Sequence, residues 1–118
     1  HQIVGMGEAS AILHREMETE NARITRLRER LLAHLLQVPG ARLNGDRARR
    51  SRGIVNVGFA GVDGETLLLA LDDLAVSTGS ACTSTSVEPS HVLRAMGVPR
   101  DLAHASLRFS IGRYTTEA

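Results

Sequence analysis

The sequence contains no lysine and no tryptophan, and all 14 of its basic residues are arginine. Without lysine the chain has no side-chain primary amine, which excludes chemistry that needs a lysine from this chain. Aromatic residues make up 3% of the 118 residues and the net charge is +1. The chain therefore has neither a strong basic field nor a platform for stacking bases, and we expect no nucleic-acid partner.

Long apolar runs and cysteine pairs are also absent. The longest purely apolar run, Leu67–Leu71, is far shorter than the ~20 residues that span a bilayer. The single cysteine, Cys82, cannot form an internal disulfide, which fits a reducing compartment. No signal peptide is visible, because Glu8 interrupts the first apolar residues. We expect a soluble, cytoplasmic, single-domain protein with no membrane partner.

Cys82 lies in the stretch Thr78–Ser86, which is built almost entirely from glycine and hydroxyl residues. A free cysteine is most often a small buried hydrophobe. This stretch has no large apolar side chain to anchor it in a core, so it favours an exposed loop in which a thiolate is solvated. A catalytic thiolate needs a positive group or a helix N-terminus nearby, and the helix predicted after Pro89 is one candidate.

Hydrophobic periodicity predicts both helices and strands along the chain. We expect an α/β (α+β) domain with helices packed on a small, mostly antiparallel sheet. Apolar residues at three- and four-residue steps predict one long or two joined helices over residues 3–37, with a solvated face that includes Arg23 and Arg28. Strands are expected at 41–44, at 54–59 in the centre of the sheet, and at 74–77. Helices are expected after Asp63 and over 90–96.

Two arginine patterns allow more than one interpretation. Four arginines lie between residues 47 and 52, and a solvated, hairpin-like connection is favoured over an anion-binding patch. In the last predicted strand, Leu107, Phe109 and Ile111 alternate with Arg108. Arg108 is therefore either a surface or ion-paired charge or a fork that binds a carboxylate, and the residues alone favour neither. There is no glycine-rich phosphate motif and no cysteine or histidine spacing for a metal.

The stretch Val76–Ser84 resembles the catalytic-loop signature of the NifS/IscS-type cysteine desulfurases, members of the class V aminotransferase superfamily. Four further stretches that resemble the same family, in the same order along the chain, are His1–Ala9, Leu43–Asp46, Glu88–Gly97 and Leu102–Glu117. The resemblance covers nearly the whole chain and is weakest at the arginine-rich loop.

The resemblance implies a homodimeric fold type I enzyme that uses pyridoxal phosphate to convert L-cysteine to L-alanine. It implies that Cys82 is the nucleophile that takes the sulfur as a persulfide, and that Arg108 holds the substrate carboxylate. The implied partners are L-cysteine and sulfur-acceptor proteins such as an iron–sulfur scaffold. A loop cysteine that serves both a cleft and an outside acceptor must move, which agrees with the composition of its stretch.

One departure from the family is the missing lysine, which such enzymes need to bind pyridoxal phosphate. The resemblance therefore implies that residues 1–118 are the small C-terminal domain, that residues 1–15 connect it to a cofactor-binding domain, and that this chain by itself has no cofactor-binding residue. We expect a fragment, whose final residues 115–118 look like the opening of a helix, and we expect the isolated chain to be inactive.

Two rival functions remain open. One is a stand-alone persulfide carrier that uses Cys82 without a cofactor, and the other is a class V aminotransferase relative without desulfurase activity. The complete string Gly79–Ser84 disfavours the second. As proton relays to Cys82, His91 and His104 are each less favoured than structural roles. Asn56, Ser80 and Ser84 are interpreted as packing or loop residues.

Overall fold

The computed structural model describes residues 1–78 and 88–117, so Cys82, Ser80 and Ser84 lie outside the described residues. Three strands and four helices follow one another along the described chain. They are α1 (Gln2–Leu35), β1 (Ala41–Leu43), β2 (Ile54–Phe59), α2 (Gly64–Ala70), α3 (His91–Ala95), α4 (Arg100–His104) and β3 (Ser106–Ser110). This mixture of helices and strands confirms the predicted fold class.

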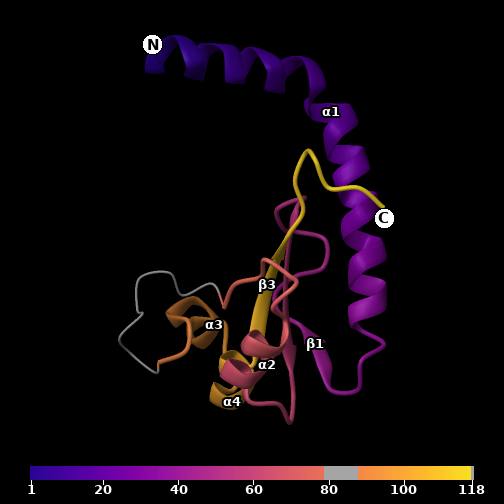
Figure 1. Ribbon diagram of the computed structural model, residues 1–118, viewed down its shortest axis with the longest axis vertical. Coiled ribbons are helices and arrows are strands. Elements are labelled where there is room, and N and C mark those ends of the chain that lie inside the picture. The colour runs from indigo at the N-terminus through magenta and orange to yellow at the C-terminus, as the bar shows by residue number, and fades with distance from the viewer. Residues whose placement is uncertain (79–87, 118) are drawn as a thin grey trace.

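The described strands form one antiparallel sheet in the order β1-β2-β3 (Figure 1). The prediction that residues 54–59 form the central strand is confirmed, because β2 pairs with both neighbours. The arginine-rich loop joins β1 to β2, so it is the hairpin-like connection that its polar composition predicted. Asp46 accepts backbone N–H bonds from Ala48 and Arg49 within this loop, and these bonds lower the pKa of its carboxyl group.

The C-terminal half of α1 covers one face of the sheet, where the core lies. Leu32 on α1 packs with Val55, Val57 and Leu107, and all four side chains are fully or almost fully buried. α1 ends before Pro39, and Gly40 turns the chain into β1 with a φ of 81°, a conformation that glycine adopts without strain. The predicted helix and its end are thus confirmed.

The N-terminal half of α1 extends away from the sheet (Figure 1). Five of its large apolar side chains are exposed, from 53% to 84%, and they are Ile3, Val4, Met6, Leu13 and Met17. Single exposed apolar side chains are ordinary, but five on one helix leave a large apolar surface that no other described residue covers.

Arg28 corrects the prediction of a fully solvated polar face on α1. Its side chain is buried, and its guanidinium group donates to the Glu29 carboxylate at 2.7 Å and to the Ser51 carbonyl at 3.3 Å. The periodicity placed Arg28 opposite the apolar stripe, but the loop after β1 folds back over that side of the helix. The Arg28 hydrogen bond lowers the pKa of Glu29, because it stabilises the carboxylate.

The second face of the sheet carries α4, which approaches β2 at Gly58. A β-carbon built on Gly58 would lie 2.7 Å from Leu102 of α4 and 2.9 Å from the Ser106 hydroxyl. Gly58 therefore allows the helix to pack directly on the strand. α3 contacts α4 on this side of the molecule (Figure 1).

Several predicted boundaries were wrong. Residues 74–77 do not form a regular strand, and only Ser77 makes an isolated antiparallel bridge, to Arg108. α4 was not predicted, and α3 begins at His91 after an N-cap at Ser90, so Pro89 is not its first residue. β3 ends at Ser110, and residues 115–117 are not helical. A helix of five residues has too few turns to show a periodic pattern, which explains the missed α4.

Candidate functional site

Arg108 lies in the middle of β3, on the face of the sheet opposite the Leu32 core. Its backbone N–H donates to the Ser77 carbonyl at 2.6 Å, and its carbonyl accepts from the Ser77 N–H at 3.3 Å. On the other side of β3, Arg108 is opposite Asn56 of β2. Because the backbone groups of Arg108 face Ser77, the Asn56–Arg108 pair is a non-hydrogen-bonded pair, in which side chains lie closest together.

A cavity of about 230 Å³ opens at this pair. We call it the Arg108 cavity, and its lining residues are Asn44, Asn56, Thr78, Ser90, Val92, Leu93, Met96 and Arg108. No acidic residue lines it among the described parts of the chain. The exposed Arg108 guanidinium makes no hydrogen bond or ion pair with another described residue. It is therefore available to bind an anion, which is the functional one of its two predicted roles.

A buried polar network forms the floor of the Arg108 cavity. The Asn44 side-chain amide donates to Asn56 Oδ1 at 2.6 Å and to Ser106 Oγ at 2.9 Å, and Ser106 in turn donates to the Leu102 carbonyl at 2.6 Å. Interpreting Asn56 as a packing residue overlooked its place beside Arg108. Its position between Val55 and Val57 was a signal, because strand alternation puts it on the face opposite the apolar residues.

The described residues on either side of positions 79–87 lie beside this cavity and near α3. Thr78 lines the cavity, and the preceding Ser77 is bonded to Arg108. At the other end, the Glu88 carboxylate makes ion pairs with Arg94 at 3.3 Å and Arg100 at 3.1 Å. Both flanks of the stretch that contains Cys82 are thus attached to the same side of the molecule as Arg108.

The two candidate proton relays do not join the Arg108 cavity. His91 is exposed at the start of α3, and His104 is half-buried at the end of α4. Neither histidine lines the cavity. The preference for structural roles over proton transfer stays a prediction, since Cys82 is outside the described residues.

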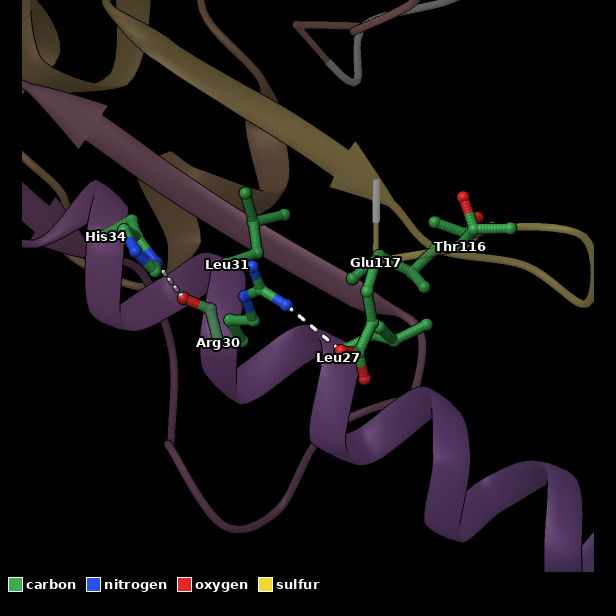
Figure 2. Close-up of a pocket in the computed structure, with 8 residues that line it drawn as sticks. Leu27, Arg30, Leu31, His34, Thr116 and Glu117 are labelled. Carbon is green, nitrogen blue, oxygen red and sulfur yellow. Dashed lines mark hydrogen bonds and ion pairs between the residues drawn. The ribbon is translucent and has the colours of Figure 1, made fainter.

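A second cavity, of about 300 Å³, lies between α1 and the C-terminal segment. Figure 2 shows Leu27, Leu31 and His34 of α1 on one side and Thr116 and Glu117 on the other. The Glu117 carboxylate is 3.1 Å from the Arg30 guanidinium. Because its one acidic side chain is already paired with Arg30, this cavity is a weaker candidate for a reactive site than the Arg108 cavity.

Neither a metal nor pyridoxal phosphate fits the part of the chain that the structure describes. The described residues hold no group of three or more histidine, cysteine, aspartate or glutamate side chains that could bind a metal ion. The whole sequence lacks the lysine that pyridoxal phosphate requires, and the described lining of the Arg108 cavity has no aromatic ring to stack on the cofactor. What the cavity can do chemically is bind a small anion such as a carboxylate. None of the described helices is long and apolar enough to cross a membrane.

Comparison with known proteins shows what the chain is similar to. It is 57% identical over 118 residues to the cysteine desulfurase IscS of Ruthia magnifica subsp. Calyptogena magnifica, covering 100% of this chain and 29% of the relative. It is 58% identical over 117 residues to the cysteine desulfurase IscS of Shewanella loihica, covering 99% and 29%. The chain thus spans less than a third of the length of these relatives.

The fold is also shared with a solved structure. The NifS-like protein from Rickettsia africae matches with a TM-score of 0.80 and 26% identity, over 97% of this chain and 29% of that one. The family model for aminotransferase class-V matches residues 1–118, the full length of the sequence. With a similar fold, similar sequences and a family match over every residue, the chain belongs to the aminotransferase class-V family.

Proposed function

We propose that this chain is the part of a pyridoxal phosphate-dependent cysteine desulfurase that carries the sulfur-accepting thiol and the substrate carboxylate site. In the proposed reaction the Cys82 thiolate attacks the sulfur of L-cysteine. The carbon–sulfur bond breaks, a sulfur–sulfur bond forms on Cys82, and the carbon takes a proton to give L-alanine. The persulfide then passes its outer sulfur to an acceptor protein such as an iron–sulfur scaffold.

The observation that carries this proposal is the Arg108 cavity beside Thr78. The Arg108 guanidinium has neither a partner nor an acidic neighbour among the described residues of the cavity, so it is suited to bind an amino acid carboxylate. Cys82 follows Thr78 by four residues in the sequence, and four residues span at most about 14 Å. We propose that this short connection lets the Cys82 thiol reach a small substrate held by Arg108.

The cofactor and the remaining active-site residues would come from outside these 118 residues. The relatives are more than three times as long as this chain, and the chain has no lysine. The exposed apolar residues of α1 support the same arrangement, because a larger protein would cover them. We propose that residues 1–15 connect this domain to the cofactor-binding domain, and that the full protein is a homodimer, located in the cytoplasm.

A stand-alone persulfide carrier is the rival that shares Cys82. The Arg108 cavity disfavours it, because a carrier that accepts sulfur from another protein has no need of a carboxylate site. An aminotransferase relative without desulfurase activity would keep Arg108 but would not depend on Cys82. A carrier would therefore depend on Cys82 but not on Arg108, whereas such an aminotransferase would depend on Arg108 but not on Cys82.

The test is turnover of L-cysteine by the full-length protein with Cys82→Ser. We expect formation of L-alanine and transferable sulfur to fall at least about a hundredfold, because serine cannot accept the sulfur. The visible absorption of the bound cofactor should stay unchanged, which serves as the control for correct loading. Sulfur transfer retained in the variant would contradict the proposal.

A further inference from the structure

The side chain of Asn56 faces the same cavity as Arg108, and the strand register fixes this arrangement. The backbone N–H of Asn44 donates to the Asn56 carbonyl at 2.9 Å, so the backbone groups of Asn56 point toward β1 and away from Arg108. Arg108 directs its own backbone groups to Ser77. The two residues thus stand opposite one another with only their side chains on the cavity side.

The buried network determines which end of the Asn56 amide faces the cavity. The Leu102 carbonyl can only accept, so the Ser106 hydroxyl must donate to it. Ser106 Oγ must then accept from Asn44, which requires the amino group of Asn44 at that position. The second proton of that amino group goes to Asn56 Oδ1.

This network occupies the oxygen of the Asn56 side-chain amide. Asn56 Nδ2 makes no hydrogen bond with another described residue. The pair therefore presents donors only, a guanidinium from Arg108 and an amino group from Asn56. A carboxylate, which accepts through two oxygens, matches this set better than an amide or a hydroxyl does.

From this arrangement, we propose that Asn56 is a second carboxylate-binding residue, which donates from Nδ2 to the substrate carboxylate that Arg108 also binds. Asn44 and Ser106 are positioning residues, because they hold the Asn56 amide in the donor orientation. The inference rests on the proposed function for the identity of the substrate as an amino acid. It extends that function by naming a contact through which this site distinguishes amino acids from amines or amides.

The test is binding of L-alanine and of L-alaninamide, measured by calorimetry, to the full-length protein with its cofactor. Asn56→Asp replaces the donor by an acceptor of the same shape, and we expect L-alanine to bind at least about tenfold more weakly. L-Alaninamide has no carboxylate, so its affinity should change less than about threefold. A role of Asn56 in folding alone would weaken both ligands alike.

Two further variants serve as a control and as an alternative to Asn56→Asp. Asn21→Asp makes the same chemical change on α1, away from the Arg108 cavity, and should leave both affinities unchanged. Asn56→Ala removes the donor without adding a charge, and it replaces the aspartate variant if that protein does not fold. It should weaken L-alanine selectively by about three- to tenfold.

The outcomes separate this inference from the proposed function. If Arg108→Ala weakens L-alanine binding but the Asn56 variants do not, the inference is wrong and the desulfurase proposal stands. If the wild-type protein binds L-alanine through Asn56 but forms no persulfide from L-cysteine, the proposed function is wrong and the inference stands. A wild-type protein that does not bind L-alanine would overturn the inference.

Discussion

Arg28 and Arg108 show how the surroundings of an arginine decide its role. The Arg28 guanidinium is buried against Glu29 and the Ser51 carbonyl, so its charge is already used within the fold. Arg108 is exposed and lies at a cavity without a partner among the described residues. Removing Arg28 would therefore affect stability, whereas removing Arg108 would affect ligand binding.

Replacing Arg108 by alanine in the full-length protein tests the carboxylate site by steady-state kinetics. We expect the KM for L-cysteine to rise about 10- to 100-fold, because a charge-assisted contact to the substrate is lost. Arg42→Ala is the matched control, since Arg42 is exposed on β1 and does not line the cavity. Unchanged KM and kcat in the Arg108 variant would count against its role.

Asn56 marks the limit of what the sequence could predict about the site. The alternation of β3 was enough to put Arg108 on the polar face. The pairing of Asn56 with Arg108 depends on the register between two strands that are distant in sequence, which no local pattern encodes. The role of Cys82 came from the family resemblance, and it stays a prediction.

α2 is the element whose beginning the sequence predicted most directly. Asp63 accepts from the Thr66 backbone N–H and hydroxyl, both at 2.8 Å, and Glu65 lies in the first turn. These features follow from local rules for helix N-termini, so they were visible without the fold. Strand 54–59 was likewise predicted from a local pattern of residues. The missed α4 and the wrong strand at 74–77 depend instead on contacts with β2 and β3.

Asp63→Ala should expose the first turn of α2 to faster amide hydrogen exchange in the full-length protein. The Thr66 backbone N–H bond lowers the pKa of Asp63 below its usual 3.8. A carboxyl whose pKa is lowered by folding stabilises the fold above its usual pKa, and this contribution disappears as pH falls through the lowered value. At neutral pH, the protection factors for residues 66–70 should be lower in the variant than in the wild-type protein.

The same difference should narrow below pH 3.8, where protonation weakens the wild-type cap as well. Asp72→Ala, beyond the end of α2, is the control and should not change these protection factors. A difference that persists undiminished at low pH would mean that the charge of Asp63 does not support the helix.

The molecule as a whole combines a packed half and an exposed half. The sheet, the C-terminal half of α1 and α2 share one core. The N-terminal half of α1 extends away from the sheet (Figure 1), and five of its large apolar side chains are exposed. The chain matches under a third of the length of its curated relatives. Both findings agree with a domain that works together with further residues of a larger protein.

The isolated 118-residue polypeptide tests this dependence. Mixed with pyridoxal phosphate and L-cysteine, it should release no more L-alanine than the free cofactor does, because it has no lysine to bind the cofactor. Chromatographic measurement of L-alanine over time gives the rate, and the full-length protein is the positive control. Release above the free-cofactor rate would show that the chain is catalytically sufficient.

The central claim is that Cys82 receives the sulfur of L-cysteine, and peptide mass spectrometry of the full-length protein tests it most directly. After brief exposure to L-cysteine, the peptide that contains Cys82 should gain the mass of one sulfur atom and lose it again on reduction. The gain should be absent in Cys82→Ser and strongly reduced in Arg108→Ala. Formation of L-alanine without any added sulfur on the Cys82 peptide would contradict the account.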